Sequence, residues 1–123
     1  MGSELPRGVR EQLQRLQQLR EQLQAIIIRK QQWQLNLGEI ERALKELESA
    51  SDDAETFKLV GPVMIATPKD KLINELKERK ELAEASIATL DKQEKLLRKQ
   101  LEDLEKRIRE RLTGGAGSGT IGG

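Results

Sequence analysis

Apolar residues recur at heptad spacing along most of this chain, and this repeat constrains the fold more than any other feature. In the first half, ten seam positions from Leu16 to Leu47 hold nine apolar residues. In the second half, nine of the twelve seam positions from Ile73 to Arg111 are apolar. Alternating steps of three and four residues place these side chains on one stripe of a helix. Each half therefore predicts a long helix that buries its stripe against a second helix.

The two stripes match each other when the helices run antiparallel. Aligning Leu47 with Ile73 also brings Leu16 opposite Leu104, with no break in the repeat between them. The predicted fold class is therefore mainly α, a long antiparallel two-helix coiled-coil hairpin. Lys30 and Glu94 interrupt the two seams, and they either pair with each other or extend separately into solvent.

Prolines and small polar residues predict where the helices begin and end. Pro6 suits a first helical position, where its missing N–H is not needed, and Pro68 after Thr67 starts the second helix in the same way. Ser and Asp at 49–53 compete for backbone hydrogen bonds and end the first helix. The resulting division is a flexible N-terminus at 1–5, a coiled coil at 6–112 and a flexible glycine-rich tail at 113–123.

Between the helices lies a short β-hairpin, predicted at about 55–67. Two apolar segments, 57–60 and 63–66, flank the turn residues Gly61 and Pro62. An isolated two-stranded hairpin is marginally stable in water, and its edges expose unpaired backbone groups. We therefore expect several subunits to join their hairpins in a shared β-barrel. The expected oligomerisation residues are Phe57, Leu59, Val60, Val63, Met64 and Ile65.

The composition excludes most catalytic chemistry. The chain has no cysteine and no histidine, and its net charge is only +1. Thiolate nucleophiles, imidazole catalysis and Cys/His zinc sites are thereby excluded, and there is no basic stripe for nucleic acid. No glycine-rich phosphate loop is present. The longest apolar run, 25–28, is far shorter than the roughly 20 residues of a membrane span. We expect a cytoplasmic protein that is not an enzyme and needs no cofactor or metal.

Three segments of the chain resemble prefoldin, specifically its archaeal β-class subunit. They are Leu37–Leu47 (LGEIERALKEL), Asp53–Glu55 (DAE) and Phe57–Ile65 (FKLVGPVMI), and the likeness extends over roughly residues 5–112. The hairpin segment is the most specific of the three. The chain differs from the family pattern in Phe57, where tyrosine is frequent, in the seam residue Trp33 and in the glycine tail.

The resemblance implies an ATP-independent molecular chaperone. In this family, β-class and α-class subunits join through their β-hairpins into a hetero-hexamer with coiled-coil arms. The arms hold unfolded client proteins and pass them to a group II chaperonin. The expected partners are therefore an α-type subunit, other copies of this chain, unfolded clients and the chaperonin.

The resemblance also implies that clients bind at the helix ends far from the β-hairpin. Fraying of the two helices there exposes apolar side chains to a non-native chain. The expected client-binding residues are Leu5, Val9, Leu13, Leu16, Ile108 and Leu112. Two alternatives remain open at this point: a scaffolding coiled coil with one fixed partner, or an engineered assembly module derived from a prefoldin.

Overall fold

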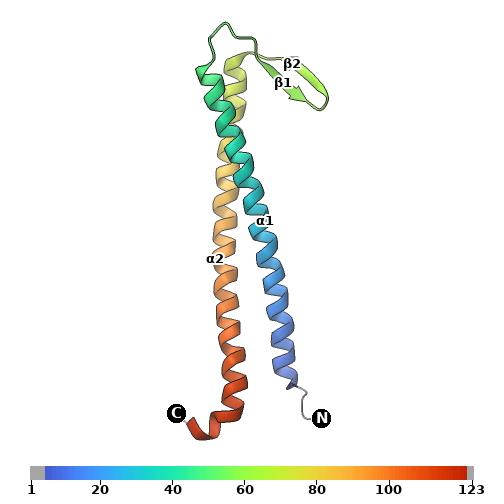
Figure 1. Cartoon of the computed structure of the whole chain (residues 1–123), viewed down its shortest axis with the longest axis vertical. Helices are drawn as coiled ribbons and strands as arrows, with labels where there is room; N and C mark the ends of the chain where they lie inside the picture. The colour runs from blue at the N-terminus through green and yellow to red at the C-terminus, as the bar shows by residue number, and fades with distance from the viewer. Residues whose placement is uncertain (1–4, 122–123) are drawn as a thin grey trace. The chain divides into compact units, whose positions relative to one another are not determined.

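The computed structural model describes the backbone of residues 5–121 and the side chains of residues 5–114. The element order is α1 (Arg7–Ser49), β1 (Phe57–Val60), β2 (Val63–Ala66) and α2 (Lys69–Ile121). Two long helices are thus joined through a short antiparallel β-hairpin (Figure 1). This confirms the predicted fold class and the predicted bounds of both strands. Sharing of the hairpin between subunits stays a prediction.

The chain divides into two compact units, which are described separately. The end unit consists of the described residues up to Ile28 together with those from Leu90 onward. The hairpin unit consists of residues Arg29–Thr89, including the whole β-hairpin. Segments of α1 and α2 pack against each other in both units.

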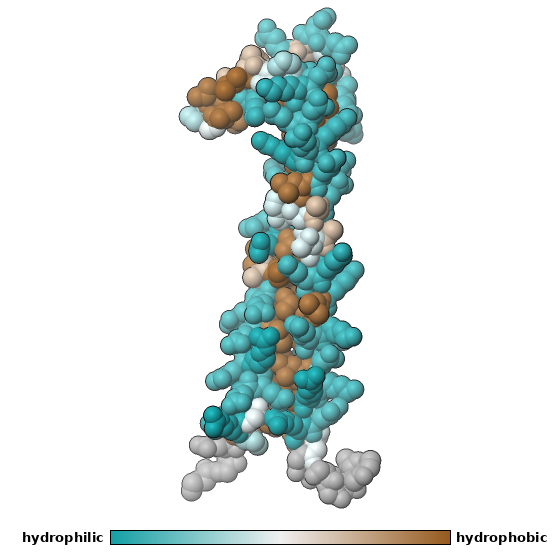
Figure 2. All heavy atoms as spheres, turned by 180° about the vertical axis from the view of Figure 1, so that it is seen from behind, coloured by the Kyte–Doolittle hydropathy of each residue, from teal (hydrophilic) through white to brown (hydrophobic). Residues whose placement is uncertain are grey.

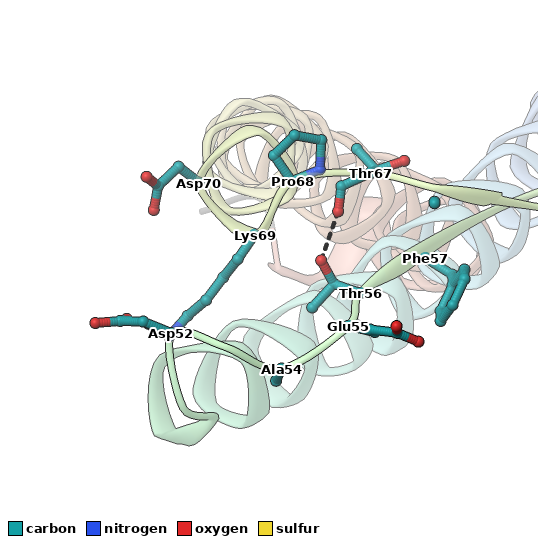
Figure 3. Close-up of a pocket in the computed structure, with 10 residues that line it drawn as sticks. Asp52, Ala54, Glu55, Thr56, Phe57, Thr67, Pro68, Lys69 and Asp70 are labelled. Carbon is teal, nitrogen blue, oxygen red and sulfur yellow. Dashed lines mark hydrogen bonds and ion pairs between the residues drawn. The ribbon is translucent and has the colours of Figure 1, made fainter.

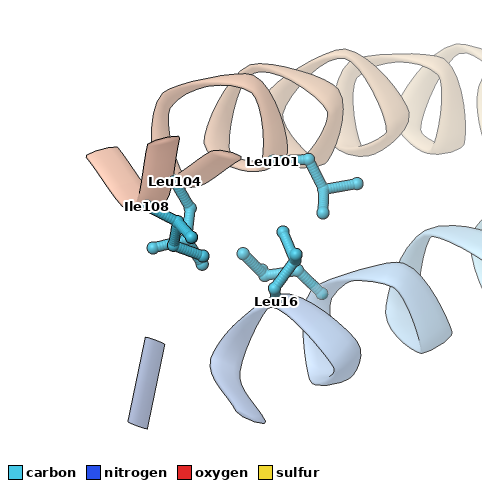
Figure 4. Close-up of a cluster of buried hydrophobic side chains, with 5 residues drawn as sticks. Leu16, Leu101, Leu104 and Ile108 are labelled. Carbon is cyan, nitrogen blue, oxygen red and sulfur yellow. The ribbon is translucent and has the colours of Figure 1, made fainter. Parts of the chain in front are cut away.

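The core of the end unit is a cluster of leucine and isoleucine side chains from both helices. Its buried members are Leu16, Leu19, Leu101, Leu104 and Ile108 (Figure 4). Leu23 and Leu97 are half-buried and pack against this cluster. The alignment derived from the heptads, which places Leu16 opposite Leu104, is therefore consistent with the packing.

The core of the hairpin unit is smaller. Ile40 and Leu44 of α1 are buried, as are Leu72 and Ala83 of α2. Three of these are seam residues, whereas Leu72 lies one position before the predicted seam at Ile73. Leu72 lines the groove between the helices and β1, so it lies beside the predicted stripe, on the side that faces the hairpin.

Both ends of α1 and the start of α2 follow the predicted signals to within one residue. Pro6 directly precedes α1 and its carbonyl accepts a hydrogen bond of 3.0 Å from the Arg10 amide. Pro68 precedes α2 in the same way, with a bond of 3.1 Å from Leu72. At the end of α1, the Ser49 hydroxyl donates to the Lys45 carbonyl at 2.9 Å, so this side chain bonds back onto the backbone of the last helical turn.

The C-terminal segment differs from the expected end of the helix at residue 112. The backbone of α2 stays helical through Ile121, and the Thr113 hydroxyl donates to the Arg109 carbonyl at 2.7 Å. An established helix gains one hydrogen bond for each further residue, which favours continuation even through weak helix formers. Flexibility of the tail stays a prediction. Residues 1–4 and 122–123, which belong to the two predicted flexible ends, lie outside the described part of the chain.

Candidate assembly and client-binding surfaces

The turn of the β-hairpin is built by Gly61 and Pro62. The strands pair in the register Phe57 with Ala66 through Val60 with Val63, which leaves a two-residue turn. Gly61 has a φ of 57°, and Pro62 has a φ fixed near −65° by its ring. A positive φ at the first turn position is typical of the turns that match the twist of paired strands, and glycine adopts it without steric cost.

Both faces of the hairpin are apolar and exposed. The register places Phe57, Leu59, Met64 and Ala66 on one face, and Lys58, Val60, Val63 and Ile65 on the other. All six predicted oligomerisation residues are exposed, from 47% for Phe57 to 70% for Leu59. Figure 2 shows them as an apolar projection on a largely hydrophilic molecule. Apolar surface of this kind marks an interaction site, because water contact with it is unfavourable.

The strand edges are available as well. The sheet contains only β1 and β2, so within the described residues each strand has one edge without a strand partner. Such an edge presents unpaired N–H and C=O groups, which a strand from another subunit can satisfy. The hairpin thus combines apolar faces with open edges.

Hydrogen bonds fix the base of the hairpin to the ends of the helices. The Thr67 amide donates to the Thr56 carbonyl at 2.9 Å. The Thr56 hydroxyl donates to the Thr67 carbonyl at 2.5 Å (Figure 3). Lys69 Nζ donates to the Ala50 carbonyl at 2.7 Å and lies 3.5 Å from Asp52 Oδ1. The segments before β1 and after β2 are therefore held together and to the end of α1.

A groove of about 470 Å³ separates β1 from the helices. It is lined by Ala43, Glu46, Leu47, Thr56, Phe57, Lys58, Leu59, Leu72, Glu75, Leu76 and Arg79. Lys58 Nζ lies 2.9 Å from Glu75 Oε2, so an ion pair joins β1 to α2 at this groove. Both side chains are about one-third exposed, at 35% and 29%.

Lys58 also determines the ionisation of Glu75. Its hydrogen bond lowers the pKa of Glu75 below the usual value for a glutamate. Partial desolvation opposes this shift, whereas the positive charges of Lys58, Lys71 and Arg79 add to it. Glu75 therefore stays charged to a lower pH than an ordinary glutamate.

The predicted client-binding residues fall into two groups in the end unit. Val9, Leu16 and Ile108 are buried, at 2%, 7% and 6% exposed, and serve as core. Leu5, Leu13 and Leu112 are exposed, at 37%, 37% and 45%. In the packed end unit, only the second group offers surface to another molecule.

Arg111 is the seam residue of α2 that follows Ile108, and it contacts α1. This seam residue is exposed, and its Nη1 donates to Gln12 Oε1 at 3.3 Å, with the guanidinium lying over Gly8. Nearby, Arg20 and Glu105 form a second link between the helices at 3.3 Å. Charged and amide groups thus link the two helices beside the apolar side chains at this end of the unit.

Two further properties of the described residues bear on other functions. In residues 5–121, no helix is both long enough and apolar enough to cross a membrane. The same part of the chain contains no group of three or more acidic, histidine or cysteine side chains placed to hold a metal ion.

Sequence reasoning missed the two contacts that attach the hairpin to the helices. Glu75 and Arg79 have the four-residue spacing at which ion pairs form along a helix, but Glu75 forms its ion pair with Lys58 of β1. The contact of Lys69 with the Ala50 carbonyl has no counterpart in the sequence pattern either. One signal was available: Lys58 is a single charge in otherwise apolar strands, and a partly buried lysine requires an acidic partner.

Comparisons with known proteins agree with this architecture. A family model described as "Prefoldin subunit" matches residues 10–115. Prefoldin subunit beta of Caldivirga maquilingensis is 41% identical over 117 residues, which cover 95% of this chain and 97% of the relative. Prefoldin subunit beta of Pyrobaculum arsenaticum is 40% identical over 110 residues, covering 89% of each chain.

Solved structures show the same fold. The crystal structure of the prefoldin beta subunit from Thermococcus strain KS-1 is similar with a TM-score of 0.81 at 39% identity, covering 89% of this chain and 96% of that chain. The prefoldin beta2 subunit from the same strain gives a TM-score of 0.66 at 22% identity, covering 72% and 95%. The second likeness concerns the fold alone.

Proposed function

Because the chain belongs to the prefoldin family, whose members are non-enzymatic chaperone subunits, we propose that it acts as the β-class subunit of a cytoplasmic, ATP-independent holding chaperone. It assembles with an α-type subunit and further copies of itself, captures unfolded proteins and transfers them to a group II chaperonin. The observation that carries this proposal is the likeness to beta subunits over nearly the whole chain.

The β-hairpin supports the assembly step. Its two faces are apolar and exposed, and both strands have an open edge. Strands from partner subunits remove both unfavourable features at once, by pairing backbone groups and by burying the apolar faces. Closing such strands into a barrel also eliminates the edges that make an isolated hairpin prone to aggregation.

The helix ends support the client-binding step. Leu5, Leu13 and Leu112 offer separate apolar contacts, each of which is small and shallow. Several arms in one assembly add such weak contacts into useful avidity without requiring a defined client sequence. Val9 and Ile108 are buried, so they take part only when the helix ends separate.

The test compares two triple variants in a complex with an α-type prefoldin subunit. The first variant, L5S/L13S/L112S, removes the exposed apolar residues of the helix ends. The matched control, L35S/L82S/L96S, removes exposed leucines elsewhere on the helices, at 70%, 59% and 58% exposed. Light scattering then measures aggregation of a chemically denatured client diluted into each complex, without nucleotide.

We expect the first variant to lose suppression of aggregation while the control retains it. Both variants should keep the wild-type helical content, because substitution of exposed residues away from the core changes stability little. Equal suppression by wild type and the helix-end variant contradicts the assignment of the client surface. Failure of the wild-type complex to suppress aggregation contradicts the proposed function itself.

A further inference from the structure

The exposed hairpin lies next to a groove in its own chain that is lined by both apolar and charged residues. The helix side of the groove contains Leu47, Leu72 and Leu76, and the hairpin side contains Phe57 and Leu59. Apolar surfaces on the two sides of a groove attract each other in water, since closing the groove removes both from solvent. The hairpin nevertheless stands away from the helices and leaves about 470 Å³ between them.

The ion pair between Lys58 and Glu75 spans this space. Lys58 is the only charged residue in β1 and β2, both of which the structure describes in full. Its contact of 2.9 Å with Glu75 links the middle of β1 to the first turns of α2. Both side chains keep about a third of their surface in water, and moving the hairpin down onto the helices would desolvate both charges.

The surrounding charges make this arrangement specific. Glu75 is faced by Lys58 from β1 and by Lys71 and Arg79 from its own helix. Glu46 of α1 lines the same groove. A positive group at residue 58 is therefore attracted to the carboxylates beside it, of which Glu75 is the one in contact, whereas a negative group there would be repelled.

We propose that Lys58 and Glu75 form a strut that positions the hairpin for assembly. The pair holds the hairpin at a fixed separation from α2, so that its apolar residues face other subunits instead of collapsing into the groove of the same chain. Lys58 and Glu75 are positioning residues that act through the hairpin. The role in assembly rests on the proposed function, whereas the strut itself can be tested in the isolated chain.

The first experiment measures the distance between hairpin and helix. The chain contains no cysteine, so spin labels can be placed at M64C and E81C alone, both at exposed positions. Pulsed electron resonance gives the distance distribution for wild type, K58M, K58E/E75K and the control K80E. The control breaks the 3.8 Å contact of Lys80 with Glu41, which joins the two helices of the same unit without touching the hairpin.

We expect a narrow distribution in wild type, a broadened and shifted one in K58M, and a narrow one again in the charge-swapped K58E/E75K. The control K80E should match wild type. An unchanged distribution in K58M overturns the strut. A K58E/E75K distribution as broad as that of K58M also overturns it, because the contribution would then come from lysine packing rather than from the ion pair.

The second experiment measures binding to an α-type prefoldin subunit. Loss of one partly exposed ion pair should weaken binding of K58M roughly fivefold, with recovery in K58E/E75K. Binding of K58M as tight as wild type overturns the role of the strut in assembly. If wild type does not bind the α-type subunit, the proposed function fails, and the distance measurement still decides whether the strut exists.

Discussion

Thr56 and Thr67 are joined by two hydrogen bonds that close the base of the β-hairpin. The Thr67 amide donates to the Thr56 carbonyl at 2.9 Å, and the Thr56 hydroxyl donates to the Thr67 carbonyl at 2.5 Å. One residue thus supplies both a backbone acceptor and a side-chain donor. This pairing extends the strand register by one residue beyond Phe57 and Ala66.

Replacing Thr56 by valine removes its hydroxyl while keeping its shape. We expect T56V to lower the free energy of unfolding by about 1 kcal/mol, because a partly buried hydrogen bond is lost and a carbonyl loses its partner. The control T67V removes a hydroxyl whose bond to the Ile65 carbonyl is solvent-exposed, and it should cost less. Urea unfolding followed by circular dichroism measures both. A larger loss in T67V contradicts the assigned geometry.

Replacing Gly38 or Gly61 by alanine should change the stability of the fold in opposite directions. Neither Gly38 nor Gly61 has a neighbouring atom within 4 Å of the point that an alanine β-carbon would occupy, but only Gly61 has a positive φ. G61A should destabilise by about 1–2 kcal/mol because of its left-handed backbone. G38A lies inside α1 and should stabilise by up to about 1 kcal/mol. Thermal melting of both variants separates these signs, and stabilisation by G61A would contradict the turn geometry.

The pH dependence of stability should contain a contribution from Glu75. Lys58 lowers the pKa of Glu75 in the folded chain below its ordinary value near 4.5. A carboxyl with a depressed folded pKa stabilises above its unfolded pKa and loses that contribution as the pH falls through the folded pKa. The melting temperature of wild type should therefore exceed that of E75Q at pH 7, and this difference should shrink as the pH falls below 4.5. A difference in melting temperature that grows as the pH falls would contradict the lowered pKa of Glu75.

Leucines of the end unit should differ in their effect on stability according to burial. L104A opens a cavity in the buried cluster and should cost about 2–5 kcal/mol. L112A changes a side chain that is 45% exposed and should stay within about 0.5 kcal/mol of wild type. Chemical unfolding of both variants gives the comparison. Similar losses in the two would show that the seam does not separate core from surface.

The regular elements were predictable because local pattern determines them. Heptad spacing identified the stripe that is buried or half-buried, and apolar segments around Gly61 identified both strands. Arg111 is the described seam position that stays exposed, because the seam meets solvent at the ends of the helices. Family membership and its non-enzymatic nature were predictable as well, since residues 57–65 carry a specific pattern.

The contacts between elements were not predictable in the same way. Glu41 and Lys45 have the four-residue spacing of a helical ion pair, yet Glu41 lies 3.8 Å from Lys80 across the helix pair. Glu75 likewise binds a strand residue instead of its helical neighbour. Asp91 and Lys95 do pair as their spacing indicates, at 3.0 Å. Side-chain partners across elements depend on the separation of the backbones, which sequence spacing does not contain.

Native mass spectrometry of this chain mixed with an α-type prefoldin subunit decides whether the hairpin is the assembly surface. We expect wild type to form one complex that contains both subunits. The variant L59S/M64S/I65S, altered only at exposed hairpin positions, should keep its helices but remain outside the complex. The account is contradicted if this variant enters the complex as wild type does, or if wild type stays apart from the α-type subunit.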